Sequence, residues 1–249
     1  MRRAVSVLLM ALPLAAGAAE EAPERPAHPA DPFEGFNRGV FAFNETVDKA
    51  VLAPVATGYR KVVPEPIRLV VGNFFGNFND AWSAANHFLQ GKPKSGVEMT
   101  MRVATNTVLG IGGLLDVATE AGLERQEEDF GQTLGTWGFG AGPYLVIPVL
   151  GPSSVRDAAG LPLDRSASPS LAFKDDAERV GLVTLNLVDT RARYLSAGRL
   201  LDEIALDRYS FLRDAYLTRR RSQVYDGEPP DLPEAGDDET GEPVAPPGR

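Results

Sequence analysis

The sequence predicts an all-α protein built from amphipathic helices, and three observations support this fold class. Apolar residues recur at spacings of three and four in several segments, which is the period of an α-helix. Residues that favour helix starts and helix ends bound these segments. A long uncharged stretch, residues 130–155, is interrupted by many Gly and Pro residues. That stretch is expected to form short elements or packed irregular backbone rather than one long helix.

The first helix is expected to begin with Asp31 as its N-cap. Pro32 at the first helical position and Glu34 three residues after the cap complete a strong start signal. An apolar stripe follows at helical spacing: Phe33, Phe36, Val40, Phe43, Val47 and Ala50. Polar residues such as Asn37 lie on the opposite side, and Pro54 is expected to end the helix.

A second helix is expected to start after "VPEP", residues 63–66, and to end near Gly91. Its polar residues fall on one face by the 100° step of a helix: Asn73, Asn77, Asp80 and His87. Asp80 is the only charged residue from Leu69 to Gly91. In a membrane, such a lone carboxylate faces a protein interior or a water-filled cavity. Periodicity alone instead favours a buried helix of a soluble domain with a solvated polar edge.

Further helices are expected along the rest of the chain. A third helix runs from Val97 to about Leu109 and leads into the tight reversal "GIGG". Two more helical segments cover residues 175–195 and 207–225. Three arginines in the second suit a helix C-terminus or acidic lipid headgroups, although a solvated face is the commoner explanation of such a run. The segment "YLVIPVL" is alternatively a strand broken at Pro148.

Composition divides the chain into four regions. Residues 1–18 have the charged start, short apolar core and A-x-A site of a secretory signal. Residues 19–30 form an extended linker rich in Pro and Ala, residues 31–225 form the helical domain, and residues 226–249 form an acidic tail that is expected to be disordered. The tail accounts for −7 of the net charge of −9, so the helical domain is nearly neutral.

The sequence offers little catalytic chemistry. A nearly neutral domain gives no electrostatic case for nucleic acid, and no Cys with only two His predicts neither a metal site nor a cofactor. Asp80, Ser83 and His87 share one side of the second helix. However, Asp80 and His87 lie two turns apart, and a hydrolase also needs an oxyanion hole. We therefore do not expect an enzyme.

Several blocks of sequence resemble one known family. These blocks are "DPFEGFNRGVFAFN", "NHFLQGKP", "NTVLGIGGLLDVA", "EDFGQTLGTWGFGAGPYLVIPVLGPSSVRDAAG" and "DTRARYL", in this order. Between Asp31 and about Asp226 the chain is similar to the MlaA family, also called VacJ, of outer-membrane phospholipid-trafficking lipoproteins. The resemblance implies an all-helical ring embedded in the periplasmic leaflet of the outer membrane. It also implies a polar channel for misplaced phospholipids, an MlaC-type periplasmic carrier and a trimeric porin as partners.

Under this resemblance, the polar stripe of the second helix becomes the candidate lining of the channel: Asn73, Asn77, Asp80 and His87. Phe41, in the polar face of the first helix, becomes a candidate gate or partner contact, although single exposed aromatic residues usually have no such role. Gly110, Gly112 and Gly113 are candidates for a mobile hairpin near the channel. As a local feature, these glycines indicate a helix C-cap.

Attachment to the membrane is a separate question. A family lipoprotein has an acylated cysteine, but this sequence has none, and Ala18 stands where that cysteine could have been. Cleavage is expected after Ala18 or Ala19, without an acyl chain. One chain gives only marginal binding, so embedded helices can hold the protein without it. The alternative is a soluble periplasmic lipid-binding or carrier protein.

Overall fold

The computed structural model describes residues 28–231, and its first helices follow one another without a loop. They are α1 (Glu34–Val47), the π-helix η1 (Asp48–Leu52) and α2 (Ala53–Val62). The prediction that Pro54 ends the first helix is wrong, because Pro54 lies in the first turn of α2. The backbone shifts to i→i+5 bonding just before it, where the Ala53 N–H donates to the Asp48 carbonyl. The π-helical turn therefore lets the helical path continue through a proline.

The start of α1 also differs from the prediction. The helix begins at Glu34, its N-cap position is Phe33, and no side chain caps it. Asp31 is instead buried and accepts a hydrogen bond from the side chain of Asn37 at 2.8 Å. Its carboxylate is thus used for a tertiary contact and not for capping.

The next two helices form a hairpin. α3 (Glu65–Leu89) confirms the second predicted helix, and α4 (Pro93–Val108) begins four residues earlier than expected because Pro93 suits a first helical turn. The predicted reversal follows α4. Its backbone enters the left-handed region at Ile111 (φ 54°), Gly112 (φ 70°) and Gly113 (φ 87°).

The uncharged stretch folds into short elements, as predicted. After α5 (Val117–Glu120) come α6 (Phe130–Thr136) and two antiparallel strands, β1 (Tyr144–Ile147) and β2 (Gly151–Ser154). Tyr144 pairs with Ser154 and Ile147 with Gly151. The alternative interpretation of "YLVIPVL" as a strand ending at Pro148 is therefore the correct one.

The C-terminal part of the domain is helical. It comprises α7 (Val155–Ser166), the 3-10 helix η2 (Pro169–Ala172), α8 (Asp176–Arg193), α9 (Leu195–Ile204) and α10 (Arg208–Val224). The two predicted segments are confirmed as α8 and α10, whereas α9 was not predicted. Side chains accept N-terminal backbone N–H groups at the starts of α7, α8 and α10: Ser154, Asp175 and Asp207.

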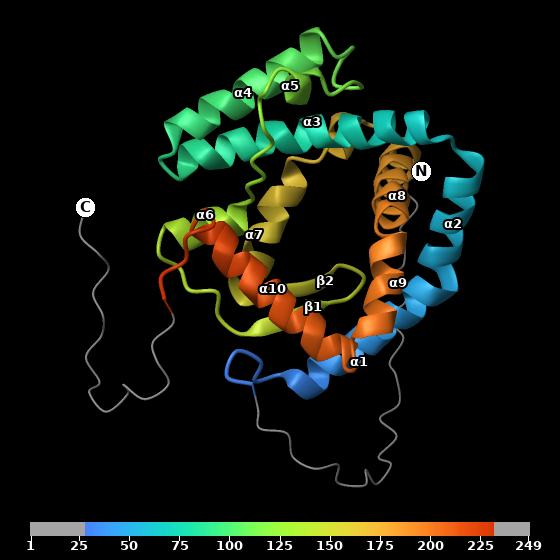
Figure 1. Cartoon of the computed structure of the whole chain (residues 1–249), viewed down its shortest axis with the longest axis vertical. Helices are drawn as coiled ribbons and strands as arrows, with labels where there is room; N and C mark the ends of the chain where they lie inside the picture. Colours follow the sequence, from blue (N-terminus) through green and yellow to red (C-terminus); the bar gives the residue numbers. More distant parts are fainter. Residues whose placement is uncertain (1–27, 232–249) are drawn as a thin grey trace, which may run out of the picture.

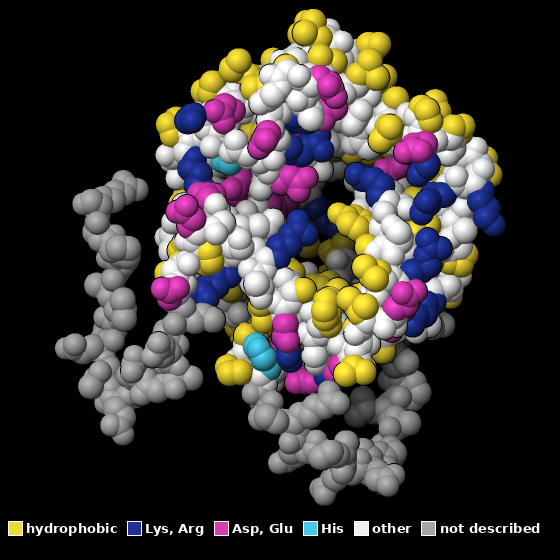
Figure 2. Space-filling view, viewed as in Figure 1, with side chains coloured by type: hydrophobic (Ala, Val, Ile, Leu, Met, Phe, Trp, Pro, Cys, Tyr) yellow, Lys and Arg dark blue, Asp and Glu magenta, His cyan; other side chains and the backbone are white. Residues whose placement is uncertain are grey.

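The helices are arranged as a ring (Figure 1). α1, η1 and α2 form one side, α3 crosses the top with α4 beside it, α7 and α10 form the opposite side, and α8 and α9 line the inside of α2. The strands and α10 meet α1, where the apolar core lies around Tyr144, Val146 and Tyr209. The space-filling view shows that the ring is hollowed at its centre (Figure 2).

The two ends of the domain are longer than predicted. Within the expected linker, the Ala30 carbonyl accepts a hydrogen bond from the Tyr144 N–H at 2.7 Å. Within the expected disordered tail, Asp226 forms an ion pair with Lys92 at 2.5 Å. The signal with Ala18 and Ala19, most of the linker and residues 232–249 lie outside the described residues.

Candidate functional site

The first helix places its apolar side outward and its polar side inward. Phe36 is 64% exposed and Phe43 is 53% exposed, whereas Asn37 is fully buried. The Asn37 amide donates to Asp31 and to the Tyr144 carbonyl, and its oxygen accepts from the Val146 N–H at 2.9 Å. The predicted apolar stripe exists, but its phenylalanines face outward, and Val40 packs against the core.

The third predicted helix, α4, shows the same inversion. Val108 is 77% exposed and Met101 is 52% exposed, whereas Arg102 and Asn106 are buried. Among the residues that the structure describes, eighteen polar or charged residues are buried against ten hydrophobic ones. Soluble domains bury their apolar faces. The outer surface of this ring is therefore suited to an apolar medium.

The polar interior is held by charge pairs, above all at Asp80. Its carboxylate accepts from Arg102 Nε at 2.9 Å and from Arg125 Nη2 at 3.1 Å, and both Asp80 and Arg102 are 1% exposed as side chains. Arg102 also contacts Asp116 at 2.5 Å. Burial would raise the pKa of Asp116, but hydrogen bonds from Thr119 and its other neighbours lower it to about 2. These pairs fasten α3 to α4 and α5.

The candidate channel stripe faces this packed region. Asn73 donates to the Leu114 carbonyl, Asn77 to the Thr107 hydroxyl, and His87 lies 3.3 Å from the Gln126 carbonyl. In Figure 1, α4 and α5 lie along one side of α3, and the ring opening lies on the other. The printed contacts of these residues lie between helices, and a role in lining the channel stays a prediction. A polar stripe alone cannot indicate whether water or protein covers it.

The Ser83 hydroxyl does not form a nucleophile–base pair with His87. It donates to the Glu128 carbonyl at 3.2 Å and accepts from the Glu128 N–H at 3.0 Å. Its hydrogen bonds therefore fix the segment before α6.

The gate candidates are also packed. Phe41 is half-buried, with its ring 5.6 Å from that of Tyr209 in an edge-on contact. Gly113 lies so close to Asn77 that a Cβ would come within 2.6 Å of its amide nitrogen, and Gly110 is equally restricted by the Leu115 and Asn106 carbonyls. The Gly112 N–H donates to the Thr107 carbonyl. The helix C-cap interpretation of "GIGG" is confirmed, and a gating role stays a prediction.

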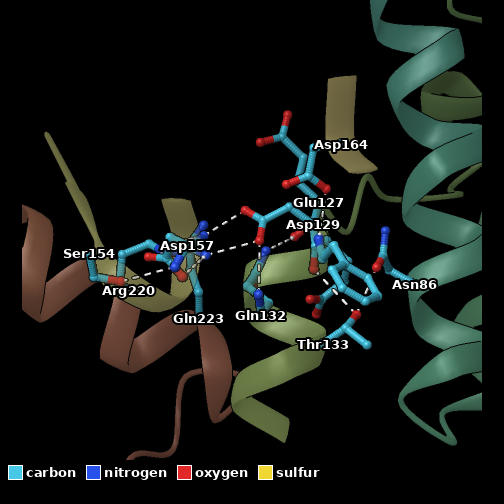
Figure 3. Close-up of polar contacts among 12 residues, drawn as sticks. Asn86, Glu127, Asp129, Gln132, Thr133, Ser154, Asp157, Asp164, Arg220 and Gln223 are labelled. Atoms are coloured by element: carbon cyan, nitrogen blue, oxygen red, sulfur yellow. Dashed lines mark hydrogen bonds and ion pairs between the residues drawn. The ribbon is translucent and has the colours of Figure 1, made fainter. Parts of the chain in front are cut away.

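The ring is fastened on its other side by Arg220 of α10. Its guanidinium contacts Asp129 at 2.6 Å and Asp157 at 2.9 Å, which joins α10 to α6 and α7 (Figure 3). Although burial would raise the pKa of Asp157, hydrogen bonds and charge from Arg220 lower it to about 2. Tyr216 also donates to Asp157.

Two cavities open beside η1, one lined by α2 and the other by α1. The α2/α9 cavity has a volume of about 470 Å³, and its lining includes Lys49, Arg60, Lys61, Arg191, Arg199 and Arg208. The inner cavity, of about 480 Å³, lies between α1, β2, α9 and α10, and its lining includes Phe41, Pro152, Tyr194, Leu201 and Leu212. Neither cavity could be predicted from the sequence, because their walls come from segments more than 100 residues apart.

The family assignment follows from comparison with known proteins. A family model described as MlaA lipoprotein matches residues 29–223. The chain belongs to the MlaA family.

Relatives and a solved structure support this assignment. MlaA proteins of Shigella flexneri and Escherichia coli, both named intermembrane phospholipid transport system lipoprotein, are 37% identical over 92% of this chain and 91% of theirs. The Haemophilus influenzae protein of the same name is 30% identical over 90% of this chain. A solved chain described under "Structural basis for maintenance of bacterial outer membrane lipid asymmetry" is 38% identical and matches with a TM-score of 0.68 over 78% of this chain and 98% of that one. The ring is thus shared with a MlaA-type protein.

Proposed function

We propose that this MlaA-family protein transports phospholipids at the outer membrane. In this proposal, the ring sits in the periplasmic leaflet, and its opening passes mislocalised phospholipids from the outer leaflet to a periplasmic carrier, maintaining lipid asymmetry. The names of its relatives support phospholipid as the transported molecule and the outer membrane as the location. The proposal also includes an MlaC-type carrier and a trimeric porin as partners. It assigns no catalytic activity to the protein.

The main support for the proposal is that the ring exposes apolar side chains and buries polar ones. Apolar faces such as that of Phe36 and Val108 are exposed, while ion pairs such as Asp80 with Arg102 are buried. No helix within residues 28–231 is both long and apolar enough to cross a membrane. Amphipathic helices bind in the plane of a membrane by their apolar faces. The exposed faces of α1 and α4 supply this attachment.

Attachment in this proposal requires no acyl chain. The sequence contains no cysteine, although the relatives are named lipoproteins. We expect cleavage after Ala18 or Ala19 and an unmodified mature protein. The intact mass of the purified protein checks this, and an added mass of a lipid would contradict it.

The experiment uses a Gram-negative host that lacks its own MlaA protein. We expect the full chain to remain with outer membranes in high salt, to leave them only with detergent, and to reduce phospholipid in the outer leaflet of the host. The matched variant is Phe36→Ser with Val108→Ser, which should weaken membrane retention. Release of the wild-type chain by salt alone would instead indicate a soluble periplasmic lipid carrier, and an unchanged outer leaflet would reject the transport function.

A further inference from the structure

The α2/α9 cavity collects cations from two facing helices. Arg60 and Lys61 belong to the last turn of α2, and Arg199 belongs to α9. Figure 2 shows Lys and Arg side chains gathered over this side of the ring, with few acidic side chains among them. The cavity is thus positive on two walls.

Most carboxylates near the cavity are already paired with other cations. Asp48 contacts Arg191 at 2.6 Å, and Glu45 contacts Lys49 at 3.3 Å and Arg208 at 3.1 Å. Asp202 also contacts Arg208. These pairs leave three lining cations with no ion pair among the described residues: Arg60, Lys61 and Arg199. Their charge is available for an anion.

The cavity also has an apolar side and an apolar neighbour. Ala53 and Leu195 belong to its lining. It shares five lining residues with the inner cavity: Asp48, Lys49, Arg191, Gly198 and Arg208. The inner cavity adds larger apolar side chains, among them Tyr194 and Leu201. A positive cavity beside one whose lining mixes charged and large apolar side chains matches a ligand with an anionic head and hydrocarbon chains.

We propose that Arg60, Lys61 and Arg199 bind the phosphate diester of a phospholipid headgroup and favour headgroups with a net negative charge. The guanidinium groups suit phosphate oxygens because they donate two parallel hydrogen bonds, and the ammonium adds a third positive charge. With the nearby carboxylates already paired, the cavity holds no free acid to receive the ammonium of a zwitterionic lipid. This inference rests on the proposed function, and it adds a headgroup preference to it.

A helix C-terminus alone does not explain this cluster. Cations in the last turn of a helix are favoured by its dipole, which accounts for Arg60 and Lys61. Arg199 lies in the middle of α9 (Leu195–Ile204), where this effect is small. The convergence of all three on one cavity points to a ligand.

The test compares the wild-type full chain with a triple variant, called the cavity variant, that carries Arg60→Gln, Lys61→Gln and Arg199→Gln. Both proteins are studied in detergent micelles. Binding of short-chain phosphatidylglycerol, short-chain phosphatidylcholine, glycerophosphoglycerol and inorganic phosphate is measured by titration. The control variant removes three exposed cations elsewhere: Lys94→Gln, Arg165→Gln, Lys174→Gln. It has the same net charge, so a general electrostatic effect changes both variants equally.

We expect the wild type to bind phosphatidylglycerol more tightly than phosphatidylcholine. The cavity variant should lose about tenfold in affinity for phosphatidylglycerol and less for phosphatidylcholine, so that the preference falls. The control variant should bind like the wild type. Equal losses in the two variants, an unchanged preference in the cavity variant, or a loss confined to inorganic phosphate and glycerophosphoglycerol would overturn the headgroup site while lipid binding itself stands. A wild type that binds neither lipid would reject the proposed function as well.

Discussion

The outward and inward faces of the same helices follow opposite rules in this protein. On α4, Val108 is 77% exposed, while Met99 and Arg102 are almost completely buried. On α1, Phe36 is exposed and Asn37 is buried. On the inward faces, buried polar groups pair with other polar groups and buried apolar side chains pack against protein. The outward faces need only be apolar. The free energy of unfolding should depend on the inward faces, and membrane attachment should depend on the outward faces.

The largest effect is expected from Asp80→Asn. The substitution removes one of the two carboxylates that pair with the buried Arg102 guanidinium and also the partner of Arg125, and breaking a buried pair costs about 3–5 kcal/mol. Chemical unfolding of the purified protein in detergent measures this loss. Asp176→Asn removes a carboxylate that is 96% exposed and serves as control, with a change of less than about 0.5 kcal/mol. Similar stabilities for the two variants would contradict the contrast between inner and outer faces.

A pair of truncations on α4 sharpens the contrast. Met99→Ala should lower the free energy of unfolding in detergent by about 2–5 kcal/mol, because it leaves a cavity in a buried site. Val108→Ala should change it by less than about 0.5 kcal/mol, because its side chain touches the surrounding medium. Equal losses would mean that Val108 is packed against protein.

The charge pairs on the inside should also make stability depend on pH. The pKa of Asp157 is lowered from 3.8 to about 2, so its stabilisation is complete above pH 4 and is lost as the pH falls from about 4 to about 2. Asp157→Asn should cost about 2 kcal/mol at pH 6, and the difference from the wild type should shrink towards pH 2. Unfolding curves at both pH values measure this. A difference that stays constant would show that Asp157 does not act through its charge.

The smallest effect is expected at the exposed reversal after α4. Ile111 is β-branched and has φ 54°, a conformation that glycine adopts without strain. Ile111→Gly should therefore raise the free energy of unfolding by about 0.5–1 kcal/mol, after allowing for the greater freedom of the unfolded chain. Leu109→Gly, at φ −94°, should lower it by about 1 kcal/mol. Destabilisation by both variants would indicate that the Ile111 side chain makes a contact that outweighs its strain.

Periodicity predicted the helices well, since the faces of α1, α3 and α4 depend only on local spacing. It could not predict which face points outward, because that depends on the surrounding medium. The resemblance to MlaA supplied this missing information. Pro54 shows a second limit: a proline ends a helix only if the backbone cannot change its hydrogen-bond register.

The individual site residues were harder to predict because their partners are distant in the sequence. Asp31 has the local signature of an N-cap, yet its carboxylate accepts from Tyr209, 178 residues further on, at 2.5 Å. Asp80 was recognised as an unusual charge, but Arg102 and Arg125 come from other elements. The unpaired cations of the α2/α9 cavity carry no motif at all.

The bond between Asp31 and Tyr209 sets an order for biogenesis. A protein chain is synthesised from its N-terminus, so α1 is available long before the residue that fastens it to α10. Until then the ring is open, and the buried polar groups of α1 lack their partners while its phenylalanines already face outward. Closure of the ring through this bond must therefore wait for almost the whole domain.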